Sequence, residues 1–167
     1  MSAYQDVIEE VKNLKGIEEA IALAIEREKE ARTFYLEKAA SMENPKFREI
    51  YEDLAKEELR HIGYLESYRD EKKLPVIETD LPSGQSFIPE FNTARIKGGE
   101  ISLGDAGILL AAMRHERKSE DFYTEVAKRA VDENQKIFFE MLARYERGHY
   151  ELIDGYLEEV TRFRMQT

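Results

Sequence analysis

A Glu-x-x-His pattern occurs twice in this sequence, and its two copies are 88 residues apart. The first copy places Glu58 before His61, and the second places Glu146 before His149. In a helix, residues three positions apart lie about one turn apart on the same face, so each copy directs a carboxylate and an imidazole toward one point. A single metal ion accepts both groups as ligands. The pattern therefore favours a helical protein with a metal site.

The same step of 88 residues relates other parts of the chain. It takes Glu28 to Glu116 and Tyr35 to Tyr123 without any change of register. Apolar pairs related in the same way are Ala24 and Ala112, Phe34 and Phe122, Leu54 and Leu142, Leu65 and Ile153, and Tyr68 and Tyr156. A period this long does not fit the short repeats of a solenoid. It predicts a duplicated helical hairpin whose two halves close on a shared site.

Hydrophobic spacing predicts one short helix and four long ones. Each long segment carries an apolar stripe with the period of an α-helix, and a glutamate takes an apolar position in each stripe. The predicted segments are a short N-terminal helix, a first helical hairpin over 17–71, a crossover over 72–101 and a second helical hairpin over 102–165. The crossover is long enough to travel the length of a bundle. We therefore expect one all-α domain over 1–167, an antiparallel four-helix bundle with one long crossover.

The overall charge and composition narrow the possible partners. The formal net charge of -10 argues against a surface for nucleic acid or anionic membrane, because either needs a basic patch. The absence of cysteine excludes disulfides and thiolate metal sites in this chain. No apolar run approaches the roughly 20 residues of a membrane span, and the acidic N-terminal stretch is unlike a signal peptide. We therefore expect no nucleic-acid or membrane partner and a cytoplasmic location.

The helix phase places four carboxylates and two imidazoles inside the bundle. Unpaired buried charges are strongly destabilising, and two divalent cations would compensate them. A carboxylate-rich site with one imidazole per ion suits iron or manganese better than structural zinc, which favours thiolates. The candidate metal ligands are Glu28, Glu58, His61, Glu116, Glu146 and His149. The alternative is a metal-free helical scaffold in which these groups form hydrogen bonds with one another.

Two stretches of the chain resemble a known group of proteins. Glu28-Lys-Glu-Ala-Arg-Thr-Phe-Tyr35 and Glu58-Leu-Arg-His61 are similar to motifs of the rubrerythrin branch of the ferritin-like di-iron carboxylate proteins, and the likeness covers most of residues 17–160. The resemblance implies a ferritin-like fold that holds two iron ions, with manganese as the alternative. It also implies that Glu58 and Glu146 bridge the metals, that Glu28 and Glu116 are terminal ligands, and that His61 and His149 bind one metal each.

The resemblance further implies an oxidoreductase of the peroxidase or ferroxidase type, acting on hydrogen peroxide or dioxygen. Rubrerythrins receive electrons through a rubredoxin domain with four cysteines, so this cysteine-free chain resembles a branch that lacks the domain and needs an external electron donor. Rubrerythrins also carry an additional Glu on the third long helix, where this chain has Ser119 followed by Glu120. The alternatives are an iron-storage or carrier protein and a di-manganese catalase-like enzyme. A homodimer or larger homo-oligomer is the expected assembly.

Four more residues near the candidate ligands have expected roles. Tyr35 and Tyr123 lie two turns from the terminal glutamates, where their hydroxyl groups would hydrogen-bond those carboxylates or pass electrons, or serve only as aromatic residues of the core. His115 lies one position off the apolar stripe, so we expect a partly exposed neighbour and not a ligand. Glu57 is expected on the side of its helix that faces solvent.

Overall fold

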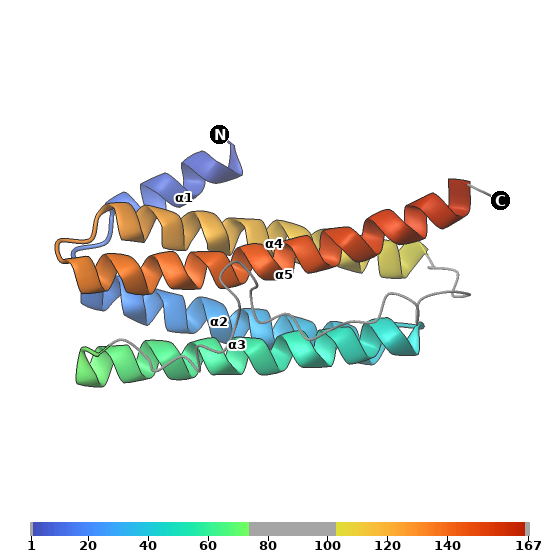
Figure 1. Ribbon diagram of the computed structural model, residues 1–167, viewed down its shortest axis with the longest axis horizontal. Coiled ribbons are helices and arrows are strands. Elements are labelled where there is room, and N and C mark those ends of the chain that lie inside the picture. The colour runs from blue at the N-terminus through green and yellow to red at the C-terminus, as the bar shows by residue number, and fades with distance from the viewer. Residues whose placement is uncertain (1, 74–102, 166–167) are drawn as a thin grey trace.

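The computed structural model describes residues 2–73 and 103–165, and helices make up most of this part of the chain (Figure 1). The helices are α1 (Ala3–Lys12), α2 (Ile17–Ser41), α3 (Pro45–Glu71), α4 (Leu103–Lys128) and α5 (Glu133–Met165). No strand occurs in the described residues. The predicted all-α fold is confirmed, whereas almost all of the predicted crossover over 72–101 lies outside the described residues.

The four long helices form two antiparallel pairs. α2 packs against α3 and α4 packs against α5, and the pairs lie one over the other in Figure 1. α3 ends at one end of the bundle and α4 begins at the opposite end, so these two helices run in the same direction. A ferritin-like bundle has this order, because one long connection separates its two hairpins. The first pair spans 17–71 and the second spans 103–165.

The turn between α2 and α3 is fixed by polar contacts. The Asn44 side chain accepts a hydrogen bond of 3.0 Å from the backbone N–H of Lys46, and Pro45 occupies the first turn of α3, where its missing N–H costs nothing. Asp105, buried near the start of α4, accepts bonds of 3.3 and 3.2 Å from the backbone N–H groups of Glu43 and Asn44. The start of the second hairpin is therefore anchored to the turn of the first.

The short helix α1 lies outside the four-helix bundle and packs against α4. Its apolar side chains Val7 and Val11 are buried. The Tyr4 hydroxyl donates a hydrogen bond of 3.0 Å to the carboxylate of Glu125 on α4. α1 therefore covers one face of the second hairpin, as expected for an accessory packing helix.

Two apolar clusters divide the core along the bundle. The first cluster includes Ile21, Ile25, Ile62, Leu65, Phe122, Val126, Phe138 and Leu142. The second includes Ala31, Tyr35, Leu54, Ala55, Leu109, Ala112, Ile153 and Tyr156. Each of the four long helices passes from one cluster to the other, and the predicted ligands lie at these transitions. Apolar side chains therefore enclose the polar centre at both ends.

Candidate metal centre

The structure brings the six predicted ligands together at mid-length of the bundle. Each long helix contributes a glutamate, and α3 and α5 each add the histidine one turn later. None of the six side chains is more than about 3% exposed. The residues are Glu28 from α2, Glu58 and His61 from α3, Glu116 from α4, and Glu146 and His149 from α5.

The ligand atoms form two groups of the size that a metal ion needs. One group is Glu28, Glu58, His61 and Glu146, and the other is Glu58, Glu116, Glu146 and His149. Within each group the ligand atoms lie within 4.8 Å of one another. Glu58 and Glu146 belong to both groups, so their carboxylates stand where they would bridge two ions. Each group has one imidazole of its own.

Distances around Glu58 show how its carboxylate is shared. Its Oε2 lies 3.5 Å from Nδ1 of His61, and its Oε1 lies 3.4 Å from Nδ1 of His149. The two imidazole rings are nearly parallel, with centroids 5.4 Å apart. One oxygen of Glu58 therefore faces each imidazole. This is the arrangement in which one carboxylate bridges two neighbouring cations.

Each histidine also faces a terminal glutamate. Nδ1 of His61 lies 3.6 Å from Oε2 of Glu28 and 3.0 Å from Oε1 of Glu146. Nδ1 of His149 lies 3.5 Å from Oε2 of Glu116. In both histidines Nδ1 is therefore the nitrogen that points into the group of ligand atoms.

Buried atoms without hydrogen-bond partners gather at this centre. Among the described residues they include both carboxylate oxygens of Glu58, both ring nitrogens of His61, Oε2 of Glu116, Oε1 of Glu146 and Nδ1 of His149. Buried polar atoms normally have a partner, because leaving one unpaired costs about 1–3 kcal/mol. Metal ions would satisfy the carboxylate oxygens together with Nδ1 of each imidazole, so the residues fit a metal centre.

The four carboxyl groups do not titrate alike. Burial raises the pKa of Glu58 to about 8, and the negative charge of Glu28 adds to this. Burial also raises the pKa of Glu146 well above its usual value. Burial acts in the same direction on Glu28 and Glu116, but hydrogen bonds and the neighbouring histidines outweigh it and lower the pKa of each to about 2. The carboxyl groups of Glu58 and Glu146, which belong to both groups, therefore hold protons more readily than those of Glu28 and Glu116.

The neighbouring carboxylates raise the pKa of both imidazoles. Burial acts to lower the pKa of His149, but the charge of Glu116 outweighs it and raises the pKa to about 10. For His61, the neighbouring carboxylates of Glu146, Glu28 and Glu58 outweigh burial and raise the pKa well above its usual value.

Two tyrosines join the two hairpins at the terminal glutamates. The Tyr35 hydroxyl on α2 donates to Oε1 of Glu116 on α4, and the Tyr123 hydroxyl on α4 donates to Oε1 of Glu28 on α2. Burial and the neighbouring carboxylates raise the pKa of both phenols, so both remain donors. Each terminal carboxylate has one oxygen engaged by a phenol and the other, Oε2, directed at its histidine.

One prediction about the surroundings was wrong. Glu57 is buried, not solvent-facing, and it forms a further group with His61 and His149 whose ligand atoms lie within 4.8 Å of one another. Its carboxylate also pairs with Arg60 at 3.2 Å. The available signal was its position four residues before His61, which places both residues on one helix face. The ring of Tyr145, which the sequence did not single out, stacks on His61 with centroids 5.3 Å apart.

Three other residues lie outside the two groups that share Glu58 and Glu146. His115 is half-buried as predicted, and its ring stacks on Phe34 at 6.2 Å. Ser119 is buried on α4, and Glu120 is half-buried and lies 3.7 Å from Arg147. Neither residue adds a carboxylate to the groups formed by the described residues.

A bundle in which two helices supply one Glu each and two supply Glu-x-x-His has the architecture of the ferritin-like carboxylate proteins. The family model for rubrerythrin matches residues 19–157, and the chain belongs to the rubrerythrin family. Searches of curated proteins and of solved structures find no significant match. Among the described residues, every helix is too short or too polar to cross a lipid bilayer.

Proposed function

We propose that the six central residues hold two divalent metal ions, with iron preferred and manganese as the alternative, and that the chain is an oxidoreductase acting on hydrogen peroxide or dioxygen. One observation carries the proposal. Two buried groups of ligand atoms share the carboxylates of Glu58 and Glu146, so both ions would be held by common ligands. A bound pair of redox-active ions supplies two electrons at one place.

The residues of this chain have separate tasks in that chemistry. Glu58 and Glu146 would hold both ions, and each histidine would bind one of them. Tyr35 and Tyr123 orient the terminal carboxylates through hydrogen bonds. The two apolar clusters limit the access of water to the centre.

Reduction of hydrogen peroxide to two water molecules consumes two electrons and two protons. This chain contains no cysteine to hold a rubredoxin-type iron, so the electrons come from an external donor. Ferroxidase chemistry differs, because ferrous ions are then the electron source and dioxygen or peroxide is the acceptor. Ser119, buried on α4, stands where rubrerythrins have an additional Glu, and this observation favours ferroxidase chemistry as the second candidate.

Metal analysis of protein from its native source, followed by an anaerobic titration with ferrous or manganous ions, tests the proposal. We expect about two ions per chain, one for each imidazole, and a melting temperature that rises with added metal, because the ions bind only the folded state. The His61→Ala and Glu146→Ala double variant should lose tight binding and keep its helical circular dichroism. Unchanged melting of the parent protein with both metals would refute metal binding.

Activity is tested on the metal-loaded protein. Peroxide added in less than one equivalent to the ferrous protein should change its visible absorption within the mixing time, and an added reductant should restore the starting spectrum. Peroxidase and ferroxidase activity are then separated by whether turnover needs that reductant or fresh ferrous ions. A hollow oligomer with many irons per chain, seen by size-exclusion chromatography and iron analysis, would instead identify a storage protein.

A further inference from the structure

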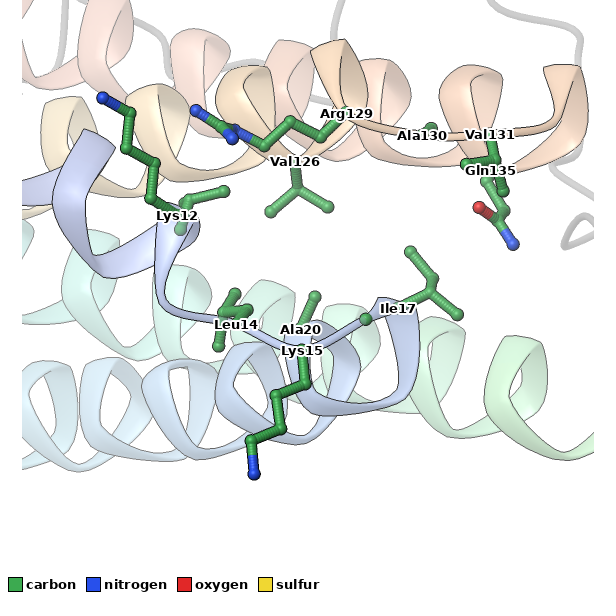
Figure 2. Close-up of a pocket in the computed structure, with 12 residues that line it drawn as sticks. Lys12, Leu14, Lys15, Ile17, Ala20, Val126, Arg129, Ala130, Val131 and Gln135 are labelled. Carbon is green, nitrogen blue, oxygen red and sulfur yellow. The ribbon is translucent and has the colours of Figure 1, made fainter.

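A cavity of about 340 Å³ lies at one end of the bundle, away from the candidate metal centre (Figure 2). It is bounded by the end of α1 and the link to α2, the first turns of α2, and the turn between α4 and α5. Ala20 is eight residues before Glu28, which corresponds to about 12 Å along α2. The lining residues are Val11, Lys12, Leu14, Lys15, Gly16, Ile17, Ala20, Val126, Arg129, Ala130, Val131 and Gln135.

Most of the cavity wall is apolar. In Figure 2 the side chains of Ile17 and Val126 extend into the space between the start of α2 and the end of α4. Val131 stands at the edge and is 92% exposed. A volume of this size with an apolar wall is at the small end of the range found for small-molecule sites. The wall therefore suits a short hydrocarbon group.

The charged residues that line the cavity are all basic, although the carboxylates of Glu19 and Asp132 accept bonds from the backbone N–H groups of Lys15 and Gln135. The chain has 35 acidic and 25 basic residues, yet the lining includes Lys12, Lys15 and Arg129 and no Asp or Glu. Figure 2 shows the ends of Lys12 and Arg129 extending toward the same side of the cavity, whereas Lys15 points away from it. A locally basic rim on an acidic protein is complementary to an anion.

A structural role accounts for only part of this arrangement. Lys12 lies in the last turn of α1 and Arg129 follows the last turn of α4, where cations interact favourably with helix C-termini. Arg129 also helps to lower the pKa of Glu125, but the Glu125 carboxylate is already bound by Lys128 and Tyr4 at 3.0 Å each. Neither role uses the apolar wall.

We infer that this cavity binds a small amphipathic carboxylate, a medium-chain fatty acid in chemical class. Its hydrocarbon tail lies between Ile17 and Val126, and its carboxylate meets Arg129 and Lys12 at the rim. The inference does not depend on metal binding, because the cavity shares no residue with the metal centre.

Octanoate is the probe, and the full chain is titrated by calorimetry with backbone amide shifts recorded in parallel. We expect one saturable site whose shifts centre on residues 11–20 and 126–135. Affinity should fall about fourfold for each methylene removed from the probe, the loss expected for buried CH₂ groups. 1-Octanol and octylammonium should each bind at least about tenfold more weakly, because they lack the anion.

Three variants locate the site. Ala130→Trp fills the cavity from the turn and should abolish binding, and Arg129→Gln should weaken it about tenfold. Lys15→Gln removes the lysine that points away and should leave affinity within about twofold, so it is the matched control. Thermal melting confirms that each variant folds. Equal octanoate affinity in the Ala130→Trp variant and the parent, or equal binding of octanoate and octylammonium, would overturn the inference.

Discussion

The first hairpin, α2 and α3, and the second, α4 and α5, agree at every candidate ligand and differ in the residues around them. Each supplies a terminal glutamate, a bridging glutamate, a histidine and a tyrosine at positions 88 apart. One residue before the bridging glutamates, however, the first hairpin has buried Glu57 and the second has half-buried Tyr145. The ligand positions, which are identical in the two hairpins, are those that would contact metal. A change at one of them would remove a ligand, whereas the neighbouring positions are free to differ.

The differing positions make the two histidines unequal. His61 is stacked by Tyr145 at 5.3 Å and lies 6.5 Å from the ring of Tyr64, whose counterpart in the second hairpin is Leu152. No aromatic ring of the described residues other than His61 is recorded against His149. A site with two-fold related ligands can therefore have two chemically distinct ends.

Loss of a bridging carboxylate should have the largest effect. Glu58→Ala and Glu146→Ala should each abolish binding of both ions, with apparent affinity reduced at least about 100-fold, because each residue belongs to both ligand groups. Calorimetry and metal analysis measure the loss. Glu52→Ala and Glu140→Ala are controls, since these two exposed glutamates are also 88 residues apart. One ion retained in full by either bridging variant would show that the hairpins do not share ligands.

Loss of a histidine should affect one ion only. His61→Ala and His149→Ala should each leave about one tightly bound ion per chain. Two ligand groups contain both Glu58 and Glu146, and each of these groups has only one of the two imidazoles. Metal analysis after gel filtration gives the stoichiometry. If one histidine variant loses both ions and the other loses none, the second ion binds only after the first. The two groups of ligands would then not be equivalent.

Replacement of a tyrosine that bonds across the hairpins should reduce metal affinity by an intermediate amount. The affected ion should be the one beside the glutamate of the opposite hairpin. Tyr35→Phe removes the donor to Glu116, so it should weaken the ion beside His149 by about 10-fold. In a His61→Ala background, which retains that ion, calorimetry should detect the weakening. In a His149→Ala background the same change should be nearly silent. Weakening of equal size in both backgrounds would contradict the crossed assignment.

Removal of the aromatic contact on His61 should have the smallest effect. Tyr145→Leu should lower the free energy of unfolding by about 1 kcal/mol, the usual strength of an aromatic stack beyond its buried area. Urea denaturation measures the change. Tyr150→Leu is the control, because Tyr150 contacts the exposed side chain of Arg147 and no ligand. Equal destabilisation by Tyr145→Leu and Tyr150→Leu would show that the Tyr145 ring does not stabilise His61. The aromatic contact would then not distinguish His61 from His149.

The sequence predicted the helices and the convergence of the six candidate ligands because both depend on residue spacing. A repeat without change of register places Glu28 and Glu116 in the same helical phase, and a common phase directs both inward. The partners of Tyr35 and Tyr123 depend on how the hairpins cross, which spacing within one helix does not specify. The burial of Glu57 was missed although its position four residues before His61 places both on one helix face, and α5 brings Tyr145 and His149 beside it.

The crossed hydrogen bonds bear on how such a chain could arise. Each hairpin carries a phenol whose acceptor is on the other hairpin, and it supplies only part of each group of candidate ligands. A free-standing hairpin would complete both by pairing with a copy of itself around a two-fold axis. The reciprocal phenols are therefore what a symmetric ancestral dimer would leave behind after its gene was duplicated and the copies were fused, and the halves differ now where they later diverged.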